Sequence, residues 1–427
     1  MSLRVARAAC VAVVVVAGFH SAARGEDWTR FRGPDGSATA IDGDAPTTWS
    51  ASQNLLWRAE LPGPGSSCPI TFGDKIFLTA YSGYGLNAEE PGEIANLRLH
   101  VLCVDRRKGT LLWDRAMPAT DPQPYEGQVT NHGYATPTPV TDGEAVYSFF
   151  GCSGVVAHDF DGNELWRTNV GSKTTGFGSA ASPILWRDTV IVNASIESQS
   201  LVALHKRTGQ EVWRVSDVKR AWNTPLVVDV EGGPSELILN CENTLRSFDP
   251  DTGDELWTCE AIKDYVCPSA VLHDGVVYVI GGRPREALAV RPGGRGDVTA
   301  THRLWFAKSG ANVTSPVVHE GHIYFLDDRG VFHCVRAEDG EIVYRERMPA
   351  GNRVYASVAL AGDKLYAVSR DQGTFVVRAN PEKYEEVALN KLDGDDSLFN
   401  ASPTIDDGQI FLRSDKYLYC IAAPAVP

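Results

Sequence analysis

The chain has 427 residues, of which 43% are hydrophobic and 22% are charged, and its formal net charge is −14. This hydrophobic content is enough for a large core. The acidic balance argues against nucleic acid as a partner, because phosphate binding requires clustered lysine and arginine. It argues equally against electrostatic docking on anionic lipid.

The first 25 residues differ in composition from the rest of the chain. Arg4 and Arg7 precede an apolar run over residues 8–19, and small residues follow at 21–25. This order is typical of a secretory signal peptide. The apolar run is too short to span a bilayer, which takes about 20 residues, so a membrane anchor is the weaker interpretation. We therefore expect residues 1–25 to direct export to the periplasm or the extracellular space, with no transmembrane segment in the mature chain.

Residues 26–53 form a lead-in rich in glycine, proline and aspartate, and an internal repeat begins at residue 54. The repeat ends in a fixed phrase: an apolar strand, a polar residue, then glycine four residues later and an aromatic residue after four more. The copies are Asp105–Gly109–Trp113, His158–Gly162–Trp166, His205–Gly209–Trp213, Asp249–Gly253–Trp257 and Arg336–Gly340–Tyr344. Counting Gly296, these glycines recur at intervals of 43 to 53 residues. Such a period with strand-type content is typical of a β-propeller.

Each repeat also begins with a recognisable phrase, a small residue beside proline or serine, followed by alternating apolar and polar residues. The eight starts are Cys68-Pro69, Thr138-Pro139, Ser182-Pro183, Thr224-Pro225, Cys267-Pro268, Ser315-Pro316, Ala356-Ser357 and Ser402-Pro403. The eight closing positions are Trp57, Trp113, Trp166, Trp213, Trp257, Trp305, Tyr344 and the region of Val387. An insertion over 291–302 separates Trp305 from its glycine. The sequence therefore predicts an all-β fold, an eight-bladed β-propeller of four-stranded antiparallel blades over 54–427.

The order of the phrases predicts how the ring closes. The repeat starts with an outermost strand at 55–57, and the chain finishes with inner strands only, at 402–411 and 417–421. We therefore expect the N-terminal strand to complete the last blade, which removes a sheet edge that would invite aggregation. In this arrangement each glycine supplies a positive φ in a hairpin, and the preceding Asp or His bonds the turn backbone. Each tryptophan then packs between neighbouring blades, burying about 150–250 Å².

Eight cysteines follow the predicted signal peptide: Cys68, Cys103, Cys152, Cys241, Cys259, Cys267, Cys334 and Cys420. Export permits disulfides, yet most of these residues lie in apolar strand-like runs, where free cysteine behaves as a small hydrophobe. The sequence does not decide whether Cys259 and Cys267 form a disulfide. No CxxC spacing occurs, so no motif predicts a metal or redox site.

The loops that lead into the first strand of each blade are the candidate binding site, because they converge near the central channel. Their aromatic, amide and basic residues are His132, Tyr134, Phe177, Trp222, Asn223, Tyr265, Asn312, Arg353, Tyr355, Phe399 and Asn400. Such a rim suits a polar organic ligand, a glycan or a peptide. The alternative is that these side chains only fill the channel and satisfy buried backbone groups.

Two long insertions lie in the first part of the ring, over 82–96 and 119–133, and long ordered loops are more often functional than short ones. The second contains Asp121, Tyr125, Glu126, Asn131 and His132. A carboxylate with a histidine is a weak signal for a base or a metal ligand, and a solvated loop is the better interpretation. No nucleophile elbow, phosphate loop, calcium loop or zinc signature is present.

The paired phrases, carried by the glycine and tryptophan pairs at 109/113, 162/166, 209/213 and 253/257, resemble the repeat of the pyrroloquinoline-quinone-type (PQQ-like) β-propellers over residues 54–421. One branch of that family, the quinoprotein alcohol dehydrogenases, carries the quinone and a calcium ion on the propeller axis. The other, the BamB-like proteins, consists of exported eight-bladed propellers that assist outer-membrane protein assembly without a cofactor. The chain lacks the adjacent cysteine pair and the length of the first branch, and it lacks the lipidation cysteine of the second.

The resemblance to the BamB-like branch implies an exported, monomeric, non-catalytic propeller that acts as a binding or assembly scaffold in the cell envelope. Its expected partner is an envelope protein, a peptide or a glycan, and no cofactor and no catalytic residue is expected. A PQQ-dependent oxidoreductase is the alternative, and it would require PQQ and calcium with Arg353 beside Asn312 or Asn400. A carbohydrate-binding or hydrolytic propeller is a further alternative, which two channel carboxylates about 5–10 Å apart would favour.

Overall fold

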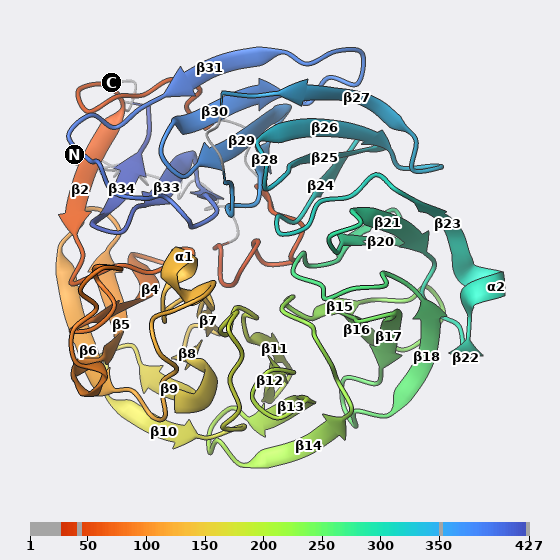
Figure 1. Cartoon of the computed structure of the whole chain (residues 1–427), viewed down its shortest axis with the longest axis horizontal. Coiled ribbons are helices and arrows are strands. Elements are labelled where there is room, and N and C mark those ends of the chain that lie inside the picture. Colours follow the sequence, from red (N-terminus) through yellow and green to blue (C-terminus); the bar gives the residue numbers. More distant parts are fainter. Residues whose placement is uncertain (1–26, 41–44, 350–352, 424–427) are drawn as a thin grey trace, which may run out of the picture.

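The computed structural model describes residues 27–40, 45–349 and 353–423, so the predicted signal peptide at 1–25 lies outside the described residues. Eight sheets are arranged around a central axis as the blades of a propeller (Figure 1). The prediction of an eight-bladed β-propeller is confirmed. Within the described part of the chain, no helix has the length and apolar character needed to cross a membrane.

The first four blades run from an innermost to an outer strand in chain order. Blade 1 contains β3 (Ile70–Phe72), β4 (Lys75–Ser82), β5 (Arg98–Asp105) and β6 (Leu111–Pro118). Blade 2 contains β7 (Val140–Thr141), β8 (Ala145–Phe149), β9 (Val155–Asp159) and β10 (Glu164–Thr168). Blade 3 contains β11 (Ile184–Trp186), β12 (Thr189–Ala194), β13 (Ser200–His205) and β14 (Glu211–Ser216). Blade 4 contains β15 (Leu226–Val228), β16 (Glu236–Cys241), β17 (Thr244–Phe248) and β18 (Glu255–Glu260).

The remaining blades follow the same plan. Blade 5 contains β19 (Val271–His273), β20 (Val276–Gly281), β21 (Glu286–Val290) and β23 (Arg303–Ala307). Blade 6 contains β24 (Val317–His319), β25 (His322–Leu326), β26 (Val331–Arg336) and β27 (Ile342–Arg347). Blade 7 contains β28 (Ala359–Ala361), β29 (Lys364–Ser369), β30 (Gly373–Arg378) and β31 (Glu386–Asn390). Blade 8 contains β32 (Thr404–Asp406), β33 (Gln409–Arg413), β34 (Tyr417–Ile421) and β2 (Leu55–Glu60).

Blade 8 closes the ring with strands from both ends of the described chain. The N-terminal strand β2 pairs antiparallel with β34, in a register that joins Leu55 to Ile421 and Glu60 to Tyr417. The predicted closure of the last blade by the N-terminal strand is therefore confirmed.

The glycine and tryptophan of the repeat join each blade to the next. Gly209 has φ +69°, and a Cβ added there would lie 2.5 Å from the ring of Trp166 in the preceding blade. The indole Nε1 of Trp166 donates to the Lys206 carbonyl at 2.8 Å, just before that hairpin. The same arrangement joins Trp57 to Gly109, Trp113 to Gly162, Trp213 to Gly253 and Trp305 to Gly340. The aromatic residue thus fills the cleft between blades, as predicted, and only glycine allows the ring so close.

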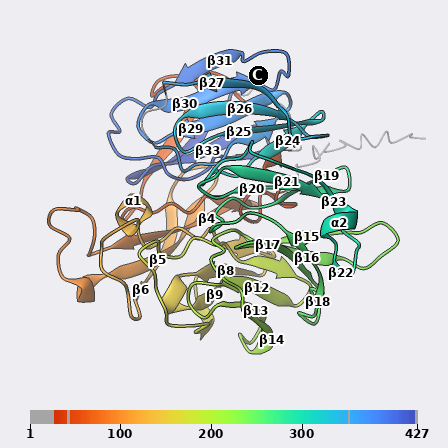
Figure 2. The same ribbon diagram turned by 45° about the vertical axis from the view of Figure 1, so that its right-hand side comes forward.

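The insertion over 291–302 breaks this pattern between blades 4 and 5. It forms β22 (Gly296–Asp297) and the short helix α2 (Thr299–His302) on the outside of the ring (Figure 2). β22 pairs parallel with β18 and gives blade 4 a fifth strand, with Gly296 opposite Trp257. Gly296 therefore does not belong to the hairpin series that the sequence indicated. The Trp257 indole donates instead to the Glu236 carboxylate at 2.7 Å.

The lead-in is packed across the inner ends of the blades. Trp28 and Arg32 are buried, the Thr71 N–H of blade 1 donates to the Trp28 carbonyl at 2.9 Å, and the Arg32 guanidinium donates to the Pro316 carbonyl of blade 6. A two-residue strand, β1 (Thr39–Ala40), then pairs parallel with β28. Figure 1 shows this red segment crossing the centre of the ring. The lead-in therefore covers one end of the central channel.

The hydrophobic core lies between neighbouring blades rather than inside any one blade, with separate clusters at successive interfaces. All eight cysteines of the described residues are free thiols, seven of them buried and Cys267 partly exposed. Cys259 and Cys267, whose pairing the sequence left open, are not bridged in the structure.

Candidate functional site

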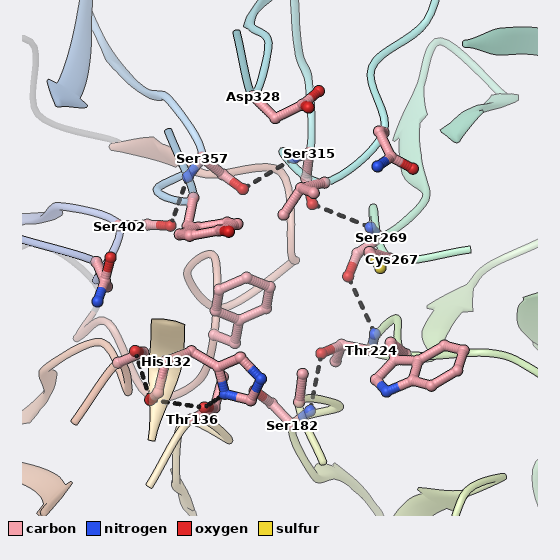
Figure 3. Close-up of a pocket in the computed structure, with 18 of the residues that line it drawn as sticks. His132, Thr136, Ser182, Thr224, Cys267, Ser269, Ser315, Asp328, Ser357 and Ser402 are labelled. Atoms are coloured by element: carbon pink, nitrogen blue, oxygen red, sulfur yellow. Dashed lines mark hydrogen bonds between the residues drawn. The ribbon is translucent and has the colours of Figure 1, made fainter. Parts of the chain in front are cut away.

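A cavity of about 430 Å³ lies on the propeller axis. Its walls are the loops that lead into the first strand of the blades, and the lead-in contributes Phe31. The volume is in the range of pockets that bind small organic molecules or short peptide segments. Figure 3 shows the side chains that converge on it.

A belt of hydroxyl groups encircles this cavity, and each hydroxyl joins two blades. Two residues before the first strand of a blade, a serine or threonine oxygen accepts a hydrogen bond from the backbone N–H at the same position in the preceding blade. The seven bonds run from residue 68 to Thr138, 138 to Ser182, 182 to Thr224, 224 to Ser269, 269 to Ser315, 315 to Ser357 and 357 to Ser402, at 2.9–3.1 Å. Figure 3 shows most of these bonds as a chain of dashed lines. The belt therefore satisfies buried backbone donors all around the axis.

Cys68 occupies the eighth belt position. Burial raises the pKa of its thiol, and hydrogen bonds from Thr138 and from the backbone and side chain of Ser402 oppose that effect. In blade 5 the belt residue is Ser269, not Cys267, because Pro268 there precedes the belt position instead of following it. The start that the sequence placed at Cys267-Pro268 is therefore displaced by two residues.

Eight of the rim residues named from the sequence line the cavity: His132, Phe177, Trp222, Tyr265, Asn312, Arg353, Tyr355 and Asn400. Three do not. Tyr134 packs against Tyr81, Tyr84 and Tyr125 beneath the 119–133 insertion. The Asn223 side chain is buried and donates to the Asn240 carbonyl at 2.6 Å, and Phe399 stacks on Tyr419. Loop residues adjacent in sequence point to opposite sides of the loop, and the repeat position alone did not indicate which side faces the axis.

Three of the cavity residues form an aromatic cluster. The Phe177 ring centroid lies 5.5 Å from that of Trp222 and 5.4 Å from that of Tyr265, and Trp222 and Tyr265 are 5.9 Å apart. The Trp222 indole donates to the Gly178 carbonyl at 2.8 Å, which fixes its orientation. Phe177 is 40% exposed. The cluster therefore offers one rigid wall and one accessible ring to an aromatic or apolar group of a ligand.

The 119–133 insertion reaches across the mouth of the cavity. It ends in the short helix α1 (Val129–His132), which Figure 1 shows on the inner side of β4. Asn131 accepts three hydrogen bonds from blades 7 and 8. Its side-chain Oδ1 accepts from Arg353 at 2.9 Å, and its backbone carbonyl accepts from Arg370 at 3.1 Å and Asn400 at 3.0 Å. On the opposite side, His132 contacts the Phe177 carbonyl at 2.8 Å. The insertion is thus an ordered cap, and the solvated loop that the sequence favoured does not describe it.

His132 is held by the cap rather than free to act as a base. The Phe177 carbonyl can only accept, so the proton is on Nε2, and Nδ1 accepts from the Thr136 hydroxyl at 2.6 Å. Burial lowers the pKa of His132 below its ordinary value, which keeps the ring neutral. Both nitrogens therefore serve to hold the cap in place.

Two amide oxygens of the cavity have no hydrogen-bond partner among the described residues. Asn312 donates from Nδ2 to the Tyr265 hydroxyl at 3.1 Å and Asn400 donates to the Asn131 carbonyl, but the Oδ1 atoms of both residues are buried without a donor. A buried polar atom without a partner is costly, about 1–3 kcal/mol. These oxygens are therefore the positions where a bound molecule with N–H or O–H groups would gain most.

The donor set of the cavity does not fit a calcium ion. Calcium takes six to eight oxygen ligands, with carboxylates prominent among them. Of the described residues that line the cavity, Asp328 is the single carboxylate, and it faces the Arg285 guanidinium at 3.2 Å. No group of three or more His, Cys, Asp or Glu side chains that could hold a metal is found among the described residues. The cavity does contain the three residues that a quinone site would require, Arg353, Asn312 and Asn400. Among the described lining residues, however, no free carboxylate lies beside them.

Sequence reasoning missed several parts of this site. The sequence indicated the belt positions only as the small residue that begins each blade. A serine or threonine two residues before the first strand of each blade is the pattern that would have predicted the hydroxyl belt. Phe31 was missed because nothing local in the lead-in shows that it crosses the channel. Gln128, Asp328 and Arg329 also line the cavity, and the sequence did not indicate any of them as rim residues.

Comparison with known proteins gives relatives of two kinds. A family profile described as "Outer membrane protein assembly factor BamB" matches residues 97–233 and 241–397. Tetrathionate hydrolase of Acidithiobacillus ferrooxidans is 23% identical over 73% of this chain and 64% of its own length. Outer membrane protein assembly factor BamB of Yersinia pestis is 26% identical over 58% of this chain and 63% of its own length. The chain thus spans less than two thirds of either relative.

Among solved structures, quinohemoprotein alcohol dehydrogenase from Comamonas testosteroni superimposes with a TM-score of 0.64 at 11% identity, covering 96% of this chain and 82% of that one. At this identity the likeness shows the shared propeller fold alone. The family profile, in contrast, covers more than half of the chain and coincides with the blades whose glycine and tryptophan residues carry the repeat. The chain therefore belongs to the family of PQQ-like β-propellers to which the outer membrane protein assembly factor BamB belongs.

Proposed function

We propose that the protein is an exported binding or assembly scaffold of the cell envelope, and that its capped channel binds a segment of another envelope protein. The observation that carries this proposal is the pair of unpartnered amide oxygens of Asn312 and Asn400 at the cavity. Export is supported by the signal-like residues 1–25, and envelope assembly is the role named for the BamB relatives.

An extended peptide matches the chemistry of the cavity better than the quinone does. A peptide backbone supplies N–H donors for the orphan amide oxygens. It also supplies carbonyl acceptors for the belt hydroxyls, each of which accepts one hydrogen bond in the structure and can donate another. An aromatic side chain of the peptide would pack on Phe177 beside Trp222 and Tyr265. Pyrroloquinoline quinone is rich in acceptors and has one N–H donor, in its pyrrole ring, so it would leave at least one of the two amide oxygens unsatisfied.

The test is binding of urea-unfolded outer-membrane β-barrel protein, and of labelled eight-residue peptides from its strands, measured by fluorescence anisotropy. We expect saturable binding that weakens about tenfold or more in Phe177→Ala and in Asn312→Leu. Leu165→Ala is the matched control, because Leu165 is also an exposed apolar residue, at 50% against 40% for Phe177, but lies on the outer strand of blade 2, away from the channel. Equal affinity of wild type and Phe177→Ala would overturn the channel as the binding site. Binding of oligosaccharides but not of peptides would replace the peptide with a glycan.

The quinone-dependent oxidoreductase is the second candidate, because Arg353, Asn312 and Asn400 line one cavity. Its weakness is the missing set of calcium ligands described above. Titration with PQQ and calcium, followed by tryptophan fluorescence and dye-linked alcohol oxidation, separates the two proposals. Turnover of tetrathionate is measured in the same series, because the hydrolase relative is named for it and Arg329 and Arg353 would face an anion. A hydrolytic carbohydrate site is not supported, since the described lining offers one carboxylate where two are needed.

A further inference from the structure

Blade 1 carries a polar cluster that the channel site does not use. It consists of Ser82 at the end of β4, His100 in β5 and Asp114 in β6. The register pairs Ser82 with Arg98 and Leu102 with Asp114, so His100 is the diagonal neighbour of both Ser82 and Asp114. Diagonal neighbours on one face of a sheet lie within reach of a histidine side chain. Three adjacent strands thus bring the three side chains together, although no local motif marks them.

The three side chains form a continuous chain of hydrogen bonds. Ser82 Oγ lies 2.8 Å from His100 Nε2, and His100 Nδ1 lies 2.8 Å and 3.0 Å from the two Asp114 carboxylate oxygens. A carboxylate only accepts, so Nδ1 carries the proton, and Nε2 is left to accept the Ser82 hydroxyl proton. The His100 ring is buried, while the side chain of Asp114 is 27% exposed and Ser82 is partly exposed. The serine of the cluster is therefore accessible to solvent, while the histidine that joins it to the carboxylate is not.

The same connectivity defines the serine–histidine–aspartate triad of acyl-transfer enzymes, in which the triad is recognised by geometry and not by sequence order. We propose that Ser82, His100 and Asp114 form an acyl-hydrolase site that acts on carboxylic esters. Ser82 Oγ bonds to the ester carbonyl carbon while its proton passes to His100 Nε2, and the ester C–O bond breaks as that proton passes to the leaving alcohol. Water then hydrolyses the acyl-serine by the reverse proton transfers, releases a carboxylic acid and restores Ser82.

The backbone beside Ser82 is closely packed and contains two glycines, Gly63 and Gly83. A Cβ on Gly63 would lie 2.1 Å from the Tyr81 carbonyl and 3.6 Å from Ser82 Cβ, so only glycine lets this connection pack against the end of β4. Gly83 follows the nucleophile directly, the position whose N–H forms part of the oxyanion hole in α/β-hydrolases. Among the described residues, neither the Gly63 N–H nor the Gly83 N–H donates to a protein acceptor.

The long insertion of blade 1 stands beside the cluster and would define its substrate. Ser82 opens it and Arg98 closes it. Within it, Leu86 is 57% exposed and Ile94 is 36% exposed, and two such side chains would favour an ester with an apolar acyl chain. None of the three cluster residues lines the axial cavity, so the activity is independent of the channel.

The test is reaction of the purified protein with a fluorophosphonate, which labels activated serines, followed by peptide mapping. We expect one label, on Ser82, which is lost in Ser82→Ala and formed at least about a hundredfold more slowly in Asp114→Asn. Hydrolysis of p-nitrophenyl butyrate should fall in parallel. Thr208→Ala is the matched control, because Thr208 also contacts a histidine, His205, but without a carboxylate behind it.

Absence of label on Ser82 in the folded wild type would overturn the proposal, and the cluster would then only satisfy a buried histidine. Equal labelling of wild type and Asp114→Asn would overturn it as well, because the carboxylate would have no part in activating the serine. The wild-type map decides the question even if one of the variants fails to fold, since it needs no variant.

Discussion

A buried carboxyl group near the cap makes the stability of the protein depend on pH. Glu197 lies between β12 and β13, is 2% exposed, and accepts a hydrogen bond from the Ser179 hydroxyl. Burial raises the pKa of Glu197 from 4.5 to about 7, and the Ser179 hydrogen bond opposes that effect. Ser179 belongs to the same loop as Phe177, so this contact ties the aromatic wall of the cavity to blade 3.

The direction of this pH dependence follows from the pKa of Glu197 in the unfolded and in the folded chain. Between pH 4.5 and about 7 the folded chain holds a proton on Glu197 that the unfolded chain has lost, so the free energy of unfolding falls as pH rises through this window. At about 1.4 kcal/mol per pKa unit the loss is worth about 3 kcal/mol. The loss of stability is complete once the pH is above the pKa that Glu197 has in the folded chain. Glu197→Gln stays neutral at every pH and removes this dependence.

The measurement is urea unfolding of wild type and Glu197→Gln at pH 5 and at pH 8. We expect the free energy of unfolding of the variant, relative to wild type, to rise by about 2.5 kcal/mol from pH 5 to pH 8, slightly less than the full value because pH 5 is already above the unfolded pKa. Glu90→Gln is the control, because Glu90 is an exposed carboxylate in the blade 1 insertion. Burial also raises the pKa of Asp415, to about 6, but that contribution is common to all three proteins and cancels. A difference that does not change with pH would refute the reasoning.

Further predictions concern the blade interfaces and the cap. Gly209→Ala should lower the free energy of unfolding by about 2–4 kcal/mol, since its Cβ meets Trp166. Gly275→Ala, with φ +72° and open space around it, should cost only about 1 kcal/mol in the same urea titration. Ser315→Ala should cost about 1–3 kcal/mol by the same assay, because it removes a belt acceptor. Asn131→Ala should speed hydrogen exchange in the cap but not in the blades, because it removes the Arg353 bond to Oδ1 while the bonds to the Asn131 backbone carbonyl remain.

The repeat made the fold predictable, because the same physical constraint recurs in every blade. A glycine hairpin such as the one at Gly209 must have a positive φ, and an aromatic ring such as Trp166 must fill the cleft beside it. Both requirements are local and can be seen in sequence. The one glycine that misled, Gly296, lies in an insertion whose outward pairing with β18 depends on the neighbouring blade.

The sequence predicted which loops form the candidate site, because these loops occupy equivalent positions in each repeat. It did not predict which side chains of these loops face the propeller axis. Tyr134 and Asn223 have the composition of rim residues, but the partners that bury them, such as Tyr84 and Asn240, come from elsewhere in the chain. The cap was missed for the same reason, because Asn131 meets its partners only after the ring has closed. The blade 1 cluster depends on strand register, which single-sequence patterns do not fix across three strands.

The closure of blade 8 sets an order on folding. β2 lies among the first described residues to emerge during synthesis or translocation, and its partner β34 is among the last. Until β34 arrives, Leu55–Glu60 has no sheet to join, and the lead-in before it has no complete channel to cross. Such a large sequence separation makes completion of the ring slow, and it leaves an unpaired strand exposed while the blades between accumulate. We therefore expect the N-terminal strand to be the segment of the nascent chain most in need of protection by a chaperone.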